Sequence, residues 1–355
     1  MRSPPHLAGR SAGPPPRGEG GTILSVQYLR GAAALLVVFY HVLQWRSGGF
    51  EIGRCGVDIF FVISGFIMWR ITSEGDEARP GLFLWRRATR IVPAYWVATL
   101  TLAAIALAWP AFLPKVKPQP EHMLLSLAFI PHLDPSGLPF PLLAPGWTLS
   151  YEAGFYLIFA AALLTPRRLR AGIVIAALGF IVVAGIALND PVYVLGANPL
   201  VLEFAFGLLI GVLAEARLAP GPGLSAALFI IGAAALAICG LAGWRSEAWR
   251  FLVWGVPAAA VVAGAIGLES RHGAPRIGLL LGLGDASYSI YLFHPIAVAA
   301  AARAIGEWKA LFIPAGLAAA VLAGLAGRVL IEKPAMRWLR QRHAGTGLPA
   351  PAGSR

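Results

Sequence analysis

The segment LRGAAALLVVFYHVLQW, residues 29–45, decides the fold because it is apolar enough to cross a lipid bilayer. A transmembrane helix needs roughly 20 predominantly apolar residues. Arg30 at the start of this segment and His41 near its far end interrupt the apolar run. The segment therefore predicts a transmembrane helix that carries two polar side chains, each of which needs polar surroundings.

The composition extends this pattern to the whole chain. Of its 355 residues, 57% are hydrophobic and 13% are charged, and the mean hydropathy is +0.70. Soluble domains carry about 25% charged residues, roughly twice this share. The sequence predicts an all-α fold, a polytopic membrane helical bundle of about ten transmembrane helices. We place the spans at approximately 23–45, 55–72, 88–109, 147–164, 171–188, 199–216, 223–243, 248–267, 284–304 and 308–332.

The net charge of +12 could indicate a nucleic-acid-binding protein. Membrane proteins, however, collect Lys and Arg in their cytoplasmic loops. With the N-terminus inside, the ten spans place most of the 29 Lys and Arg residues in cytoplasmic segments. We therefore expect both termini in the cytoplasm, membrane lipids as the surroundings and no nucleic-acid partner. The pattern does not indicate an oligomeric state.

The chain divides into one membrane domain and two tails. Residues 1–22 are rich in Pro and Gly and predict a disordered N-terminal tail, without the apolar core of a cleavable signal. Residues 23–332 form the membrane domain, and 333–355 form a cytoplasmic C-terminal tail. The outer segment 110–146 carries nine prolines and is either a functional lid or a connector.

The two cysteines, Cys55 and Cys239, fit no metal-binding or redox spacing. They are either inert apolar residues or partners in a disulfide.

Arg30 and His41 are eleven residues apart, which places them within roughly 20° of the same helix face and about 16 Å apart along the axis. Ionisable groups within spans usually face the bundle interior or a watery cavity. We expect both side chains to face one cavity, Arg30 at its cytoplasmic end. Asp58, at the outer start of the second span, lies at a depth similar to that of His41. It can orient the imidazole of His41 as a general base, and it can also cap its helix.

Three arginines, Arg86, Arg87 and Arg90, gather at the cytoplasmic mouth of the third span. Guanidinium groups bind phosphate in bidentate fashion, so this cluster predicts a site for a cytosolic phosphorylated donor. A single arginine there could serve topology alone. Beside Arg30, three at this spacing favour binding.

Glu152 lies about one turn inside the fourth span, flanked by Trp147 and Ser150. A carboxylate at this depth needs a partner, which we expect to be His41 or a substrate hydroxyl. The ninth span carries Ser287, Tyr288 and His294, which suggest a polar lining. On its own, such a His is more often a hydrogen-bonded packing residue.

Five motifs now stand in a recognisable order. They are the Arg30–His41 pair, GVDIFFVISGF (56–66), RRATRIVPAYW (86–96), GWTLSYE (146–152) and SYSIYLFHP (287–295). Together they resemble the acyltransferase-3 family of integral membrane acyltransferases, from about residue 25 to residue 334. The first two motifs look most like exopolysaccharide O-acetylating members of the ExoZ type.

The resemblance implies transfer of an acyl group, usually acetyl, from cytosolic acetyl-CoA. The acceptor is a hydroxyl of an extracytoplasmic polysaccharide or a lipid-linked saccharide, the location a bacterial inner membrane, and no metal is expected. The site residues that we expect are catalytic His41, Asp58 and Glu152, donor-binding Arg30, Arg86, Arg87 and Arg90, and substrate-binding Trp147, Ser150, Ser287, Tyr288 and His294.

The same residues are compatible with other mechanisms and functions. His41 acts as a general base or carries the acyl group itself in a covalent intermediate. The protein itself could convey acetyl groups to a separate transferase, or transport a glycan. Transporters often show paired broken helices in related halves, and the sequence shows no such pairing.

Overall fold

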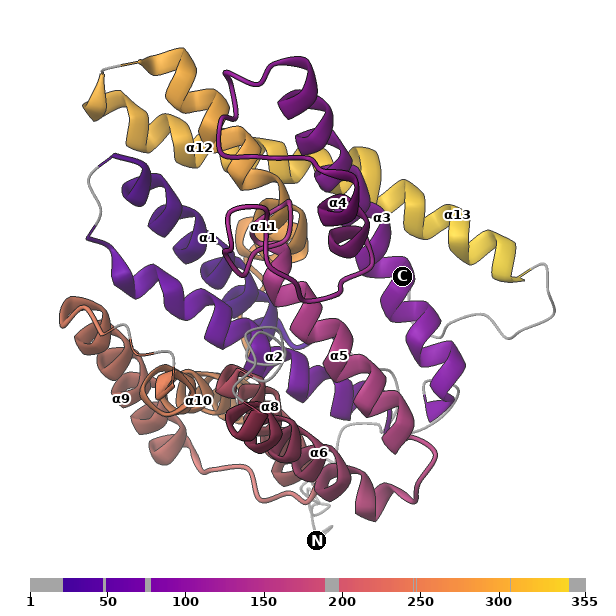
Figure 1. The fold of residues 1–355 in the computed structure, drawn as a ribbon. Coiled ribbons are helices and arrows are strands. Elements are labelled where there is room, and N and C mark those ends of the chain that lie inside the picture. The colour runs from indigo at the N-terminus through magenta and orange to yellow at the C-terminus, as the bar shows by residue number, and fades with distance from the viewer. Residues whose placement is uncertain are drawn as a thin grey trace, which may run out of the picture.

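The computed structural model describes residues 22–46, 49–73, 78–188, 198–244, 246, 248–306 and 308–344. All regular secondary structure in these residues is helical, which confirms the all-α prediction (Figure 1). The helices are α1 Leu24–Arg46, α2 Cys55–Ile71, α3 Pro80–Ala108, α4 Pro120–Leu127, α5 Gly146–Ala162, α6 Arg167–Leu188, α8 Leu202–Glu215, α9 Pro222–Leu241, α10 Val256–His272, α11 Gly278–Ile305, α12 Lys309–Gly327 and α13 Lys333–Ala344. Short 3₁₀ or π-helical turns are η1 Glu51–Arg54, η3 Pro199–Val201, η4 Phe251–Gly255 and η5 Arg328–Glu332.

Eight helical segments in the described ranges are long and apolar enough to cross a membrane. They contain α1, α2, α3, α6, α9, α10, α11 and α12. The remaining two predicted spans, 147–164 and 199–216, correspond to α5 and α8, which are only 17 and 14 residues long. The multi-pass bundle is thus present, with two helices shorter than the bilayer requires. Residues 1–21 of the predicted tail 1–22, and the residues after 344, lie outside the described part.

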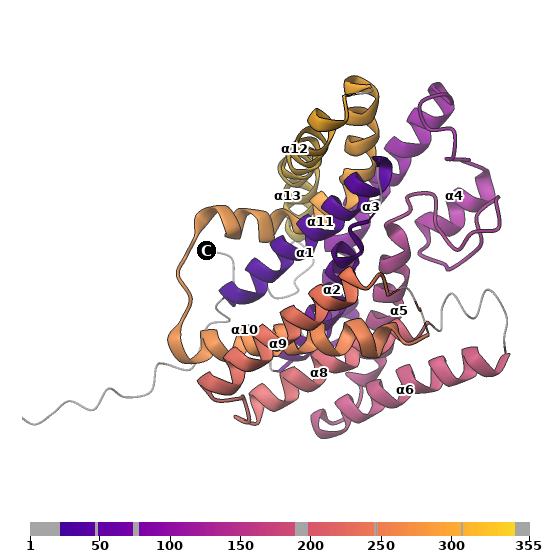
Figure 2. The ribbon, with the colours of Figure 1, turned by 90° about the vertical axis from the view of Figure 1, so that its left-hand side faces the viewer.

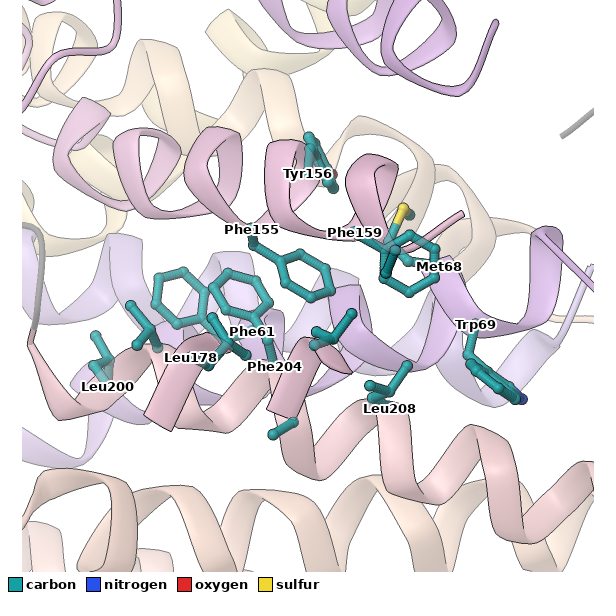
Figure 3. Packing of buried hydrophobic residues seen from close by; sticks show 14 of the residues in the cluster. Phe61, Met68, Trp69, Phe155, Tyr156, Phe159, Leu178, Leu200, Phe204 and Leu208 are labelled. Carbon is teal, nitrogen blue, oxygen red and sulfur yellow. The ribbon is translucent and has the colours of Figure 1, made fainter. Parts of the chain in front are cut away.

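Helix α2 lies at the centre of the bundle, with α1 on one side and α8 on the other (Figure 1). Helices α1, α11 and α12 pack together on the first side, and α9 packs against α10 on the second (Figures 1 and 2). Between α2, α5, α6 and α8 lies a core of aromatic rings (Figure 3). Phe204 stacks on both Phe61 and Phe155, with ring centroids 4.5 and 4.3 Å apart. This core holds α5 against the central helix.

Two glycines let α2 and α8 approach closely. A Cβ atom on Gly65 would lie 2.0 Å from the carbonyl oxygen of Phe204, and one on Gly207 would lie 1.8 Å from that of Val62. Small residues at helix contacts permit this backbone approach in membrane proteins. The contact therefore depends on the absence of a side chain at both positions.

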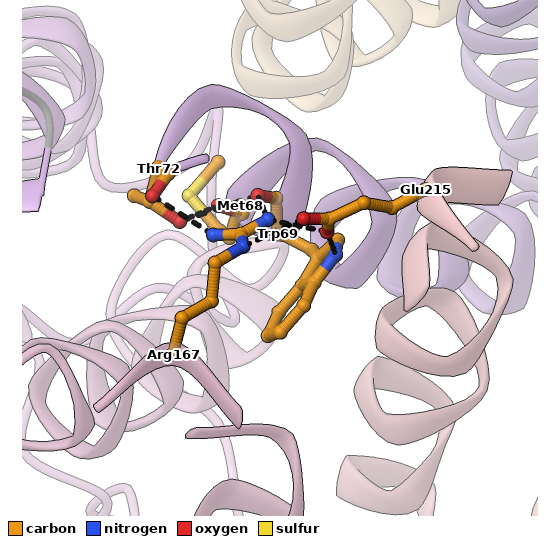
Figure 4. A network of polar contacts seen from close by, with 5 residues as sticks. All are labelled: Met68, Trp69, Thr72, Arg167 and Glu215. Atoms are coloured by element: carbon orange, nitrogen blue, oxygen red, sulfur yellow. Dashed lines mark hydrogen bonds and ion pairs between the residues drawn. The ribbon is translucent and has the colours of Figure 1, made fainter. Parts of the chain in front are cut away.

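A polar network joins the ends of α2, α6 and α8 (Figure 4). The Arg167 guanidinium lies over the ring of Trp69, 4.1 Å from its centroid, and donates hydrogen bonds to Glu215 at 2.6 and 2.9 Å. It also donates to the carbonyl oxygen of Thr72 at 3.0 Å. Trp69 Nε1 donates to the same carboxylate at 2.5 Å. The network fixes the three helix ends relative to one another.

The proline-rich outer segment packs on α3 through specific bonds, with α4 beside that helix (Figure 2). Tyr95 and Trp96 of α3 donate to the carbonyl oxygens of Ser126 and Leu127, at 3.0 and 2.9 Å. The Ser126 hydroxyl in turn accepts from the backbone N–H of Leu142 at 2.8 Å. The segment is therefore an ordered part of the bundle. Elsewhere, Cys55 and Cys239 are free thiols, which decides against a disulfide between them.

We predict that Gly207→Ala destabilises the bundle, because the added methyl group must displace the backbone of α2. Overpacking of this kind costs about 1–3 kcal/mol. The measurement is the thermal unfolding midpoint of purified protein in detergent. Gly179→Ala on α6 is the matched control, since a Cβ atom there meets nothing within 4 Å. A Gly207→Ala protein that unfolds at the wild-type temperature would contradict the close approach of the two helices.

Candidate active site

A cavity opens within the bundle between α1, α2, α3, α5 and α11, with about 770 Å³ of space not filled by atoms, including its mouth. Its walls combine apolar side chains with a polar set that is unusual for a membrane interior. The polar lining residues are Arg30, Ser64, Arg87, Arg90, Thr148, Glu152, Tyr156, Ser287, Tyr288 and Tyr291.

Three of the four predicted donor-binding arginines line this cavity. Arg30 enters from α1, and Arg87 and Arg90, three residues apart on α3, enter from one helix face. Arg30 also donates to the side chain of Gln27 at 3.3 Å. The fourth, Arg86, is not among the described residues that line the cavity. The structure therefore divides the basic motif into two cavity-lining arginines and one outside.

Glu152 provides the negative charge in this cavity. Its Oε1 atom accepts hydrogen bonds from Ser64 Oγ, at 2.7 Å, and from the hydroxyl of Tyr156. Against three guanidinium groups, this single carboxylate leaves the lining with a formal charge of +2. The expected contact with His41 is replaced by these two hydroxyl donors. Tyr156 was not predicted, although it lies four residues after Glu152 and thus on the same helix face.

Asp58 does not orient His41, contrary to expectation. Its carboxylate forms a two-bond ion pair with Arg250, each bond 3.0 Å long, and both side chains are buried. His41 instead has its Nδ1 atom 2.8 Å from the carbonyl oxygen of Val37, one turn earlier in α1. The sequence did not reveal Arg250 as the partner because it lies 192 positions after Asp58.

The ring of His41 lies against that of His294, with centroids 4.8 Å apart and planes inclined at 49°. His294 is fully buried, whereas His41 is exposed. Neither ring lines the cavity. Arg30 and His41 therefore do not face one common space, contrary to the expectation. One residue of the cavity wall, Tyr291, has its ring centroid 6.0 Å from that of His294.

The hydroxyl of Tyr291 is bound at the start of α5. It lies 3.0 Å from Thr148 Oγ1 and 3.2 Å from the carbonyl oxygen of Pro145. On the same stretch of α11, Tyr288 donates to the carbonyl oxygen of Ile91 at 2.6 Å. Ser287 is fully buried, lines the cavity, and its hydroxyl has no hydrogen-bond partner among the described residues. Such a group is available to a ligand.

Trp147 and Ser150 line a second, smaller cleft of about 290 Å³. They lie on the face of α5 opposite to Glu152, so the structure does not bring them into the main cavity. Tyr151 and five residues of the outer segment complete the lining of this outer cleft, namely Ile130, Pro131, His132, Pro139 and Pro141. Behind it, His132 Nε2 is 2.7 Å from Nδ1 of His122. Burial, followed by the adjacent His132, lowers the pKa of His122.

Among the described residues, no group of three or more His, Cys, Asp or Glu side chains is arranged to hold a metal ion.

Comparisons with known proteins agree with the motifs. The family model described as "Acyltransferase domain" matches residues 23–329. The chain is 38% identical to the exopolysaccharide production protein ExoZ of Rhizobium meliloti, over 88% of this chain and 98% of that protein. It is 28% identical to the putative membrane-bound transacylase BcsY of Komagataeibacter xylinus, over 90% and 87%. Over 39% of this chain and 24% of the relative, it is 34% identical to the peptidoglycan O-acetyltransferase OatA of Listeria monocytogenes. No solved structure matches the chain.

We predict that Asp58→Leu strongly destabilises the protein, because it leaves the buried guanidinium of Arg250 without its carboxylate. Breaking a buried ion pair from one side costs about 3–5 kcal/mol, whereas apolar replacement of both partners is often neutral. The double variant Asp58→Leu/Arg250→Met should therefore recover most of the unfolding midpoint in detergent. A single variant as stable as wild type would show that the ion pair does not hold the fold.

Proposed function

Because the chain belongs to the acyltransferase-3 family, we propose that this multi-pass membrane enzyme moves an acetyl group from cytosolic acetyl-CoA to a hydroxyl of an exopolysaccharide. The similarity to ExoZ, which extends over nearly all of that protein, supports an exopolysaccharide acceptor. The name of BcsY supports transacylation at a membrane. We place the enzyme in a bacterial inner membrane with both termini in the cytoplasm.

The observation that carries this proposal is the set of three arginines in one cavity. Coenzyme A bears several phosphate oxygens, and guanidinium groups bind such oxygens in pairs. Arg30, Arg87 and Arg90 would hold them, drawn by the formal charge of +2 on the cavity lining. Before the donor binds, Glu152 offsets one of these three positive charges within the membrane interior. Arg86 has no place in this site.

The remaining length of the donor extends from the arginines toward the outer half of the bundle. Ser287 and Tyr288 lie on the same wall as Tyr291, and we assign them to contacts with the pantetheine arm. The hydroxyl of Ser287 supports this assignment because it lacks a partner among the described residues. The thioester would reach His41 once Tyr291 moves from its present position.

His41 is the proposed general base. With Nδ1–H directed at the carbonyl of Val37, the Nε2 atom bears the lone pair that can accept a proton. It would take the proton of a sugar hydroxyl as that oxygen attacks the thioester carbonyl. The C–O bond forms, the C–S bond breaks, and the thiolate of coenzyme A leaves. An acyl-His41 intermediate would use the same nitrogen.

The outer cleft offers a surface for the acceptor. The ring of Trp147 stands nearly perpendicular to that of Tyr151, with centroids 5.6 Å apart. Aromatic faces combined with the hydroxyl of Ser150 suit a saccharide, which has both apolar and hydrogen-bonding surfaces. We propose that a sugar of the polysaccharide, or of its lipid-linked precursor, rests here while a neighbouring hydroxyl reaches His41. Asp58 contributes indirectly, by holding α2 in place through Arg250.

His41→Ala should reduce acetyl transfer about 10²- to 10⁴-fold, the contribution expected of a positioned general base. The measurement is mass spectrometry of surface polysaccharide from a deletion strain that expresses the variant. Continued secretion of unacetylated polysaccharide supports an enzyme, whereas loss of secretion would indicate a transporter. Normal O-acetylation at wild-type protein levels would refute the role of His41. Purified protein that acetylates a glycan with acetyl-CoA alone would exclude a mere conveyor of acetyl groups.

Arg87→Ala and Arg90→Ala should each raise the KM for acetyl-CoA, with little effect on kcat. Loss of a hydrogen bond to a charged group costs about 1.5–3 kcal/mol, or roughly 10- to 100-fold in KM. Transfer of labelled acetyl groups in inverted membrane vesicles, at a series of acetyl-CoA concentrations, gives both constants. Arg86→Ala is the matched control and should leave KM near its wild-type value. Equal effects of all three substitutions would show that the cavity does not select the donor.

A further inference from the structure

His294 is the most buried titratable side chain next to the proposed base, and the mechanism above does not use it. It is 0% exposed, and its Nε2 atom has no hydrogen-bond partner among the described residues. An unsatisfied buried polar group costs about 1–3 kcal/mol, so an ordinary packing histidine would have both nitrogens bonded. We therefore expect this nitrogen to form a hydrogen bond in a state of the protein other than the resting one.

The backbone fixes the same tautomer in both rings. Nδ1 of His294 lies 2.7 Å from the carbonyl oxygen of Tyr291, as Nδ1 of His41 lies 2.8 Å from that of Val37. A carbonyl oxygen can only accept, so both Nδ1 atoms carry hydrogen in the neutral rings. Both Nε2 atoms are then acceptors. Two acceptors cannot bond to each other, which accounts for the unsatisfied nitrogen of His294.

Protonation of His41 changes the hydrogen bonding between the two rings. The ring centroids are 4.8 Å apart, so a small rotation of either ring brings edge atoms of the two imidazoles within hydrogen-bond reach. Once His41 is protonated, its Nε2–H becomes a donor and His294 Nε2 is the neighbouring acceptor. This bond exists only in the charged state, and interactions made only there accelerate the reaction.

We propose that His294 is a positioning residue that accepts a hydrogen bond from protonated His41 and thereby stabilises it during acyl transfer. The inference rests on the proposed function, in which His41 takes the proton of the sugar hydroxyl. The two imidazoles hold that proton between their Nε2 atoms while the ester forms and the thiolate leaves. The proton then passes to the thiolate or to water, which completes the balance.

Two substitutions separate the nitrogens of His294. His294→Asn keeps a donor for the carbonyl of Tyr291, in the place of Nδ1, but reaches no further. His294→Gln places an amide oxygen near the position of Nε2, where it can accept from protonated His41. Gln is also closer to His in volume, so a role in packing alone favours Gln over Asn as well. The two roles are therefore separated by the His41→Ala background, in which only a packing role causes a further loss.

The experiment measures kcat and the KM for acetyl-CoA in membrane vesicles from cells that express each variant. We expect kcat to fall roughly 10- to 100-fold for His294→Asn, the value of a hydrogen bond to a charged group, and less for His294→Gln. KM should stay near wild type, which also shows that the donor cavity of each variant is folded. In a His41→Ala background, the His294 substitutions should cause no further loss, because the group they act through is gone.

A higher kcat for His294→Asn than for His294→Gln, or wild-type kcat in both, would overturn this inference. So would a full additional loss in the His41→Ala background. Failure of the proposed function would give a different result. In that case the single variant His41→Ala, with His294 intact, would remain active. Inactive His41→Ala together with unaffected His294 variants would leave the proposed function in place and remove only the role of His294.

Discussion

The buried ion pair between Asp58 and Arg250 is the interaction on which the arrangement of the bundle depends. Two charges in a low-dielectric interior are tolerated only when each satisfies the other with good geometry. Here both bonds are 3.0 Å long, and they join the first turn of α2 to the residue that precedes η4. Helix α2 is consequently fixed at the centre, and its two sides are available to α1 and α8.

The central helix α2 also contributes to the polar cavity inside the bundle. The face of α2 that carries Ser64 contributes to the cavity, while Gly65, the next residue, allows the backbone of α8 to approach. Helices α3 and α5 close the cavity with arginines and with Glu152. The three cations and the one carboxylate thus lie on the walls of one cavity inside the bundle. A donor with several negative charges would find here both charge complementarity and a route into the membrane.

The sequence predicted the class of fold, the order of the helices and most of the polar cavity residues, because apolar runs and intramembrane charges are local signals. Arg30, Arg87, Arg90, Glu152, Ser287 and Tyr288 all line the cavity as polar residues in spans should. The sequence did not predict which residues pair with one another across the bundle. Helical rotation shows which face a residue occupies but not which distant helix meets that face, so Arg250 remained hidden as the partner of Asp58.

For the same reason, the sequence does not show how far the cavity extends or which residues bound it. The spacing of Arg30 and His41 predicts one face of a helix, but whether a cavity reaches both side chains depends on residues from other helices and cannot be inferred from spacing. Tyr291, from α11, lines the cavity beside His294, and Trp147 and Ser150 belong to a separate cleft because they project from the other face of α5. The motif GWTLSYE contains Trp147, Ser150 and Glu152, and the structure distributes them over two cavities.

The attachment of Tyr291 at the start of α5 has a consequence for the membrane itself. A bilayer that sustains an electrochemical gradient cannot hold a protein with a continuous aqueous channel through it. In the proposed transfer, the ring of Tyr291, on the cavity wall and 6.0 Å from that of His294, would move aside for the acyl group and close again before ions could follow. Tyr291, carried on α11, would then act as a gate that the contacts of its hydroxyl with Pro145 and Thr148 hold closed.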